Sequence, residues 1–336
     1  MSDGYESKEG YDVIGDVHGH ASRLRLLLRH MGYVESSGTW RHPSRTAVFV
    51  GDLIDRGPAQ AACVAIARSM VEAGSALIVM GNHEFNALAY ATPDPEDPAR
   101  HLRPGHLDPT PVPGDKDVRG KNFTQHRSYL DQVGGFGSGL HRQHLDWFRT
   151  IPLWLDLGGL RVIHAYWGDR DIDHVRPLLG PGHTLTPDLL TAASRKGSSE
   201  YEAVEDLLKG PEVDLGGDLG YLDKDGHQRH RSRLRWWHTA SRSLRAMALI
   251  PGGVERTGSW PPDGLLPDHE IDGNVAPPYT SDVPVIVGHY WESGVPTVFG
   301  PKVACVDYSV AKGGLLVAYR WSHGETELTD DRFVAV

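Results

Sequence analysis

Short apolar runs alternate with amphipathic stretches over the first 90 residues of the chain. The runs have the β-branched and apolar composition of buried strands, and they occupy residues 11–14, 46–50 and 76–80. The first stretch repeats leucine at the spacing of one helix face up to Gly32, and the second, 59–73, ends at Gly74. This order predicts parallel strands joined by right-handed crossovers, with the loops after the strands at one edge of a sheet.

The rest of the chain predicts more strands and two long polar segments. Residues 91–120 are rich in proline and predict a surface loop, and residues 168–280 predict a polar insertion that covers the sheet edge like a cap. Residues 121–148 predict helix with a glycine-rich interruption. Further strand runs occupy residues 153–157, 160–163, 283–287, 303–306 and 314–321. We therefore expect one α/β domain over residues 1–336 that contains both segments.

Composition excludes several classes of protein. The chain of 336 residues is 39% hydrophobic and 23% charged, which is typical of a globular fold and not of a disordered or membrane protein. Its formal net charge of −10 disfavours a stable nucleic-acid partner and attachment to anionic membranes. Cys63 and Cys305 lie far apart in apolar surroundings, and no secretory signal is evident at the N-terminus, so we expect a cytoplasmic protein.

Polar side chains follow five of the predicted strands at the points where those strands end. They are Asp16, His18, Asp52, Asp55, Asn82, His83, His164 and His289. Mixed carboxylate, amide and imidazole ligands suit manganese, iron, zinc or nickel better than magnesium or calcium. The number of donors is sufficient for two divalent ions that share one carboxylate, an arrangement that promotes phosphoryl displacement.

Three ordered motifs give these residues a family context. They are Gly-Asp-Val-His-Gly at 15–19, Gly-Asp-Leu-Ile-Asp-Arg-Gly at 51–57 and Gly-Asn-His-Glu at 81–84. In this order and spacing the chain resembles the calcineurin-like metallophosphoesterase superfamily, in the branch of the phosphoprotein phosphatases and symmetrical dinucleoside tetraphosphatases. The resemblance implies an α/β fold with a two-sheet sandwich flanked by helices and an inserted cap.

The same resemblance implies the ligands of two metal ions. The first ion would be held by Asp16, His18 and Asp52. The second would share the carboxylate of Asp52 and take three further ligands, Asn82, His164 and His289. Manganese is the expected ion, with iron, zinc or nickel as alternatives.

The resemblance also implies catalytic roles for three residues. His83, oriented by Asp55, would protonate the leaving oxygen, and Arg56 would clamp the phosphoryl oxygens. Each role has a physical reason, because a carboxylate raises the pKa of an imidazole and a guanidinium matches two phosphate oxygens. Hydrolysis would proceed by direct attack of metal-bound hydroxide, without a covalent enzyme intermediate.

The substrate is left open by the sequence. Asp307-Tyr308-Ser309 departs from the Asp-Thr-Gly that is common in the nucleotide-cleaving relatives. The basic stretch 224–245 is either a solvated helix face or an electropositive part of the cap, with Arg233 or Arg235 binding phosphate. Lys121, Asn122 and His126 could reach the site, although no pattern requires it.

The leading function is therefore hydrolysis of a phosphomonoester, with protein phosphoserine or phosphothreonine as one such substrate. The alternative within enzymes is hydrolysis of dinucleoside polyphosphates or another nucleotide. The alternative from another class is a scaffold that binds metal without turnover.

Overall fold

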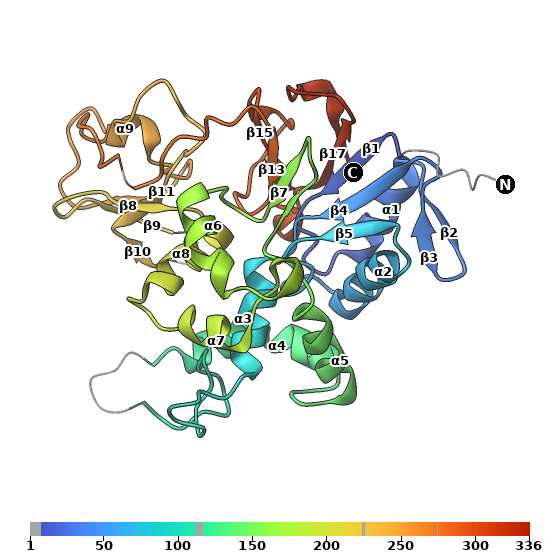
Figure 1. Ribbon diagram of the computed structural model, residues 1–336. Coiled ribbons are helices and arrows are strands. Elements are labelled where there is room, and N and C mark those ends of the chain that lie inside the picture. The colour runs from blue at the N-terminus through green and yellow to red at the C-terminus, as the bar shows by residue number, and fades with distance from the viewer. Residues whose placement is uncertain (1–7, 112–116, 224–225, 274) are drawn as a thin grey trace.

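The computed structural model describes residues 8–111, 117–223, 226–273 and 275–336 (Figure 1). Residues 112–116 of the predicted loop and residues 224–225 of the basic stretch therefore lie outside the described residues. No helix in the described ranges is long and apolar enough to cross a membrane.

The first sheet has the strand order β16-β17-β1-β4-β5, and β18 pairs with β17. Its strands are β1 Gly10–Ile14, β4 Arg45–Phe49, β5 Ala76–Ile78, β16 Asp307–Tyr308, β17 Leu315–Ser322 and β18 Phe333–Ala335. Strands β1, β4 and β5 are parallel, which confirms the predicted parallel order, whereas β17 runs antiparallel to β1. The loops after β1, β4 and β5 consequently meet at one edge.

The second sheet has the strand order β14-β15-β13-β7-β6. Its strands are β6 Trp154–Asp156, β7 Arg161–Ile163, β13 Val285–Val287, β14 Val298–Gly300 and β15 Val303–Cys305. Strand β13 lies parallel to both β7 and β15. The histidines that follow β7 and β13 therefore lie at the same end of this sheet.

The two sheets pack face to face. A buried core between them combines Val13 and Val48 of the first sheet with Val162 and Ile286 of the second. A larger core joins the sheets to the helices on their outer faces. These helices are α1 Ala21–His30, α2 Gln60–Glu72, α3 Asn82–Ala91, α4 Arg119–Gln132 and α5 Gly139–Phe148. The expected two-sheet sandwich with flanking helices is confirmed.

The insertion 168–280 contains more β-structure than the sequence predicted. Its helices are α6 Asp169–Val175, α7 Pro187–Ala192, α8 Ser199–Lys209 and α9 Leu244–Met247. Its strands are β8 Glu212–Asp214, β9 Gly220–Leu222, β10 Gln228–Arg229, β11 Arg231–Arg233 and β12 Arg256–Thr257. They form two small sheets, and most of these elements gather on one side of the sandwich (Figure 1). The described part of the basic stretch thus includes strands β10 and β11 where a helix face was one expectation.

Candidate metal centre

The carboxylate of Asp52 lies at the centre of a group of imidazoles from three different parts of the chain. Its Oδ2 atom lies 3.6 Å from Nε2 of His18, 3.5 Å from Nε2 of His164 and 3.9 Å from Nε2 of His83. All four side chains are almost completely buried. Segments that are distant in sequence therefore bring one carboxylate and three imidazoles together.

Backbone carbonyl groups fix the orientation of two of these rings. Nδ1 of His18 lies 2.8 Å from the carbonyl of Ile54, and Nδ1 of His164 lies 2.7 Å from the carbonyl of Val50. A ring nitrogen that faces a carbonyl carries the proton, so in the neutral ring the lone pair is on Nε2. In the neutral form of each ring, the lone pair on Nε2 therefore faces the carboxylate of Asp52.

The side chains of Asn82 and His164 place an amide oxygen close to an imidazole nitrogen. Oδ1 of Asn82 lies 3.0 Å from Nε2 of His164. Burial opposes the protonated form of His164, but the charge of Asp52 outweighs it and raises the pKa. A proton or a metal ion on Nε2 would relieve the repulsion between these electron-rich atoms.

His289 is buried with neither ring nitrogen hydrogen-bonded. Burial first, and then the nearby positive charges of Arg233 and His164, lower the pKa of His289 well below its usual value. Its ring is consequently neutral and offers a lone pair. Burial likewise lowers the pKa of His18 to about 3, and Nε2 of that ring also has no hydrogen-bond partner.

Carboxylates crowd the same space. Burial, together with the charges of Asp307 and Asp52, raises the pKa of Asp16 well above its usual value. Burial would raise the pKa of Asp52, but the charges of His164 and His83 outweigh burial and lower that pKa well below its usual value. Three buried carboxylates in mutual repulsion are stabilised by bound cations.

The donor set fits two metal ions. Two groups of three residues could each hold an ion, because within each group the ligand atoms all lie within 4.8 Å of one another. One group is His18, Asp52 and His83, and the other is Asp52, His164 and His289. They share Asp52. Asp16 belongs to neither group, but its carboxylate accepts the backbone N–H of His289 at 3.3 Å.

The backbone around these residues is held in an uncommon conformation. Seven non-glycine residues near the group have positive φ angles: His18, Asp52, Asp55, Arg56, His289, Trp291 and Ser309. Such angles cost free energy and cluster at functional sites, where the surrounding fold maintains them. Gly288 permits the close packing, because a Cβ atom there would lie 2.2 Å from Oδ1 of Asp16.

Glu84 ties the start of helix α3 to the loop after β4. Its carboxylate is fully buried and accepts the backbone N–H groups of Asp52 at 2.8 Å and Leu53 at 2.9 Å. Burial, followed by the charge of Asp52, raises the pKa of Glu84 to about 7. Through these hydrogen bonds Glu84 supports the loop that carries Asp52.

A chain of hydrogen bonds connects three side chains beside the group. Nδ1 of His83 lies 2.5 Å from Oδ2 of Asp55, and Nδ1 of His126 lies 2.9 Å from Oδ1 of the same carboxylate. Burial would raise the pKa of Asp55, but His126 and then His83 lower it below its usual value. Asp52 and Asp55 in turn overcome the effect of burial and raise the pKa of His83.

The three arginines that the sequence predicted to bind phosphate, Arg56, Arg233 and Arg235, have different surroundings. Arg56 is exposed, and its Cζ atom lies 5.1 Å from the ring centroid of Trp291. Arg233, on strand β11, approaches the same ring at 5.9 Å. Arg235 donates to the carbonyl of Ala246 within the insertion.

Sequence reasoning assigned no role at the site to Asp307, Trp291 or Lys312, and it named His126 only as a residue that could reach the site. Asp307 had a signal, because it directly follows the predicted strand 303–306. Its carboxylate accepts the backbone N–H groups of Trp291 and Ser309, each at 3.0 Å. For Trp291 and Lys312 no local pattern existed, since only tertiary contacts bring them to the site.

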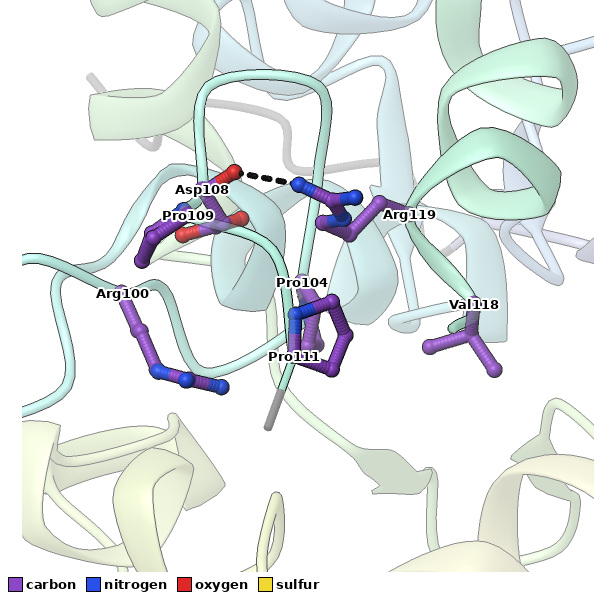
Figure 2. Close-up of a pocket in the computed structure, with 7 residues that line it drawn as sticks. All are labelled: Arg100, Pro104, Asp108, Pro109, Pro111, Val118 and Arg119. Carbon is purple, nitrogen blue, oxygen red and sulfur yellow. Dashed lines mark hydrogen bonds between the residues drawn. The ribbon is translucent and has the colours of Figure 1, made fainter. Parts of the chain in front are cut away.

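A cavity of about 300 Å³ lies elsewhere, in the proline-rich loop (Figure 2). Its lining includes Arg100, Asp108 and Arg119, and Arg119 donates to the backbone carbonyl of Asp108 at 2.9 Å. None of the lining residues belongs to the metal-ligand groups. The chemistry of the cluster is therefore separate from this cavity.

Comparison with known proteins points to one family. Residues 11–217 match the family described as calcineurin-like phosphoesterase. Two bacterial relatives named bis(5′-nucleosyl)-tetraphosphatase PrpE [asymmetrical] match short segments. The protein of Geobacillus sp. (strain WCH70) is 47% identical over 73 residues, and that of Anoxybacillus flavithermus is 42% identical over 74 residues. These segments cover 21% and 22% of this chain and 30% of each relative, so the chain spans less than a third of their length.

Two solved structures align over nearly the whole chain. A serine/threonine phosphatase from Saccharomyces cerevisiae, with similarity to human phosphatase PP5, is 14% identical with a TM-score of 0.49 and covers 97% of this chain and 78% of its own. A cold-active protein-tyrosine phosphatase of a psychrophilic Shewanella is 16% identical with a TM-score of 0.44 and covers 98% and 85%.

Proposed function

Because the chain belongs to the calcineurin-like phosphoesterase family, we propose that it is a dinuclear-metal-dependent hydrolase of phosphomonoesters. The observation that carries the proposal is the position of Asp52, whose carboxylate is common to both groups of potential ligands. A shared carboxylate is what a pair of closely spaced ions requires. Manganese is the ion that we propose, with iron, zinc and nickel as alternatives.

In this proposal six side chains bind the ions: Asp16, His18, Asp52, Asn82, His164 and His289. When bound, the ions would supply an acidified water and neutralise charge on the phosphoryl oxygens. The buried, unpartnered ring nitrogens of His18 and His289 support this ligand set.

The remaining chemistry falls to residues beside the ions. His83 would donate the proton on Nε2 to the leaving oxygen, while Asp55 holds its Nδ1–H and fixes the ring. The raised pKa of His83 favours the protonated form that a proton donor needs. The exposed guanidinium of Arg56 would bind two phosphoryl oxygens and stabilise their developing charge.

We propose that the insertion 168–280 acts as a cap on this site within a single domain. The contact of Arg233 with the ring of Trp291, two residues after His289, supports this role. Arg235 would contribute positive charge at the cap. A phosphorylated protein or small molecule in the cytoplasm is the partner that we propose.

A second candidate function is hydrolysis of dinucleoside polyphosphates. The names of the two bacterial relatives favour it, although their matched segments are short. Screening phosphopeptides, diadenosine tetraphosphate and nucleoside monophosphates side by side would separate the two substrate classes.

Hydrolysis of p-nitrophenyl phosphate tests the proposed enzyme. We expect activity that depends on manganese and is lost in Asp52→Asn, which keeps the shape of the side chain but removes the shared charge. An inert wild-type chain with manganese, iron, zinc and nickel would instead indicate a metal-binding scaffold.

A further inference from the structure

The insertion reaches the loops of the second ligand group through one aromatic side chain, Trp236. This residue lies between strand β11 and helix α9, and its side chain is fully buried. Its indole N–H donates to the hydroxyl of Tyr290 at 2.8 Å, and its ring packs edge-on against the ring of Tyr166, with 5.3 Å between the centroids. Trp236 therefore contacts two tyrosines from the loops after strands β13 and β7.

Each of these tyrosines follows a histidine that we propose as a ligand of the second ion. Tyr290 is the next residue after His289, and Tyr166 comes two residues after His164. The backbone joins the same two loops, because the N–H of Gly288 donates to the carbonyl of His164 at 2.8 Å. The insertion thus adds a side-chain link between loops that the backbone already connects.

The position of the His289 ring depends on its loop more than the positions of the other proposed histidine ligands do. Backbone carbonyls lie close to Nδ1 of His18 and Nδ1 of His164, whereas both ring nitrogens of His289 lack a hydrogen-bond partner among the described residues. His289 moreover has a positive φ angle of 70°, which the surrounding structure must maintain. The ring is consequently placed by its backbone and by the contacts of the adjacent Tyr290.

The side chain of Tyr290 is tightly enclosed. It is buried, and a Cβ atom added to Gly210, at the end of helix α8, would lie 2.4 Å from its hydroxyl oxygen. Trp237, next to Trp236, stacks on Phe299 of strand β14 with 4.0 Å between the ring centroids, which anchors the insertion to the second sheet. A buried hydrogen bond is costly to break, because the partner left behind cannot reach water. The bond from the insertion to Tyr290 therefore holds the loop of His289 in place.

We propose that Trp236 is a positioning residue for the second metal ion, because it holds the loops of His164 and His289 at the spacing that this ion requires. The insertion would thus complete the second ligand group, whereas the first group, on the loops after β1 and β4, would not depend on it. This inference rests on the proposed function, in which His164 and His289 bind the second ion and His18 binds the first.

Calorimetric titration of the metal-free full chain with manganese tests the inference. Trp236→Phe keeps an aromatic ring and removes the N–H, and Tyr290→Phe keeps the ring and removes the hydroxyl. Trp321→Phe is the matched control, because this tryptophan is also buried and its N–H donates to the carbonyl of Glu325 at 3.0 Å. Trp321 pairs with Tyr11 at the start of β1, whereas the proposed ligands follow the end of that strand.

The wild-type chain is expected to bind two ions. In Trp236→Phe and in Tyr290→Phe the affinity for one ion should fall about tenfold, and the affinity for the other should change by less than about twofold. The double variant should lose no more than either single variant, because both substitutions remove the same hydrogen bond. Trp321→Phe should bind both ions as the wild type does.

Ligand variants identify the ion that is affected. In a His289→Ala background, which already lacks a ligand of the second ion, Trp236→Phe should not weaken manganese binding further. In a His18→Ala background, the remaining ion should still bind about tenfold more weakly when Trp236 is replaced. Tyr290→Phe, which removes a single oxygen atom, gives the same readout if circular dichroism shows that Trp236→Phe does not fold.

Equal losses for both ions in Trp236→Phe, or the same loss in Trp321→Phe, would indicate a general effect on folding and overturn the inference. Unchanged binding of both ions in Trp236→Phe and Tyr290→Phe would also overturn it. A wild-type chain that binds fewer than two manganese ions would reject the two-ion centre and the inference with it.

Hydrolysis of p-nitrophenyl phosphate by the same wild-type sample reads out the proposed function separately. A wild-type chain without turnover, in which Trp236→Phe still weakens one of two bound ions, would reject the hydrolase and keep the positioning role. Turnover by the wild type, with unchanged metal binding in the variants, would reject the positioning role alone.

Discussion

Nδ1 of His126 lies 2.9 Å from Oδ1 of Asp55, on the opposite side of the carboxylate from His83. His126 comes from helix α4, whereas Asp55 belongs to the loop after β4 and His83 to the first turn of helix α3. The carboxylate that orients the proposed proton donor is therefore itself oriented by a second imidazole. His126 is accordingly a positioning residue that acts through Asp55.

Replacing His126 should slow turnover more for poor leaving groups than for good ones. His126→Phe keeps an aromatic ring between Tyr90 and Tyr129 but removes the hydrogen bond. We expect kcat for phenyl phosphate to fall about tenfold with little change in KM, and kcat for p-nitrophenyl phosphate to fall less. Steady-state kinetics on both esters provide the measurement. Equal losses on the two esters would assign His126 to folding alone.

Adding one methyl group at Gly288 should disrupt the proposed metal centre. The new Cβ atom of Gly288→Ala would lie 2.2 Å from Oδ1 of Asp16, so the carboxylate or the loop must move. Overpacking of this kind costs about 1–3 kcal/mol, and we expect weaker metal binding as well. Gly300→Ala is the matched control, since no atom lies within 4 Å of its added Cβ. Unchanged manganese affinity in Gly288→Ala, measured by calorimetry, would contradict the prediction.

Manganese should stabilise the fold, and its removal should destabilise it. Ligands that bind only the native chain add about 2.7 kcal/mol at a hundredfold excess over Kd. The repulsion among Asp16, Asp52 and Asp307 gives the ions a further favourable effect. Thermal unfolding with manganese and after chelation measures the shift in Tm, which Asp52→Asn should largely abolish. The proposed ligand set fails if the variant keeps the wild-type shift.

Asp206 should make the insertion less stable at alkaline pH. Burial, together with the charge of Asp171, raises the pKa of Asp206 to about 7 in the native state. Between its usual pKa near 4 and about 7 the unfolded chain binds fewer protons, so this contribution to stability falls as pH rises. Asp206→Asn should therefore stabilise the protein more at pH 8 than at pH 5, by on the order of 1 kcal/mol.

Urea unfolding of this variant at the two pH values provides the measurement. Asp173→Asn, on the exposed side of helix α6, is the control and should show no such difference. A gain in stability from Asp206→Asn that is the same at pH 5 and pH 8 would speak against a protonated native carboxyl.

The strands and loops of the site were largely predictable, because each motif directly follows an apolar run. Parallel order then brought the loops after β1, β4 and β5 to one edge, as expected for strands that alternate with helices. The short strands of the insertion were missed. Strand β10 has two exposed residues, and β11 carries polar side chains, so neither has the apolar alternation that predicts a strand.

Side chains that enter the site through tertiary contacts were harder to predict. His126 was one of three residues that could reach the site, and only packing of helix α4 against the sheet-edge loops selects it. The side chains of Lys312 and Trp291 are in contact although the two residues are more than twenty positions apart and share no motif. Hydrophobic periodicity reports which face of an element is buried, and it carries no information about such encounters.

The positive φ angles of Asp52, Asp55 and Arg56 have a consequence for the adaptability of the protein. Glycine would relax the backbone at each of these positions while deleting the group that the proposed chemistry needs. Selection for thermal stability alone would thus favour glycine at these positions, which would preserve the fold but remove the proposed activity. Directed evolution of this chain should retain an activity screen at every round, so that variants of higher thermal stability are not selected at the expense of activity.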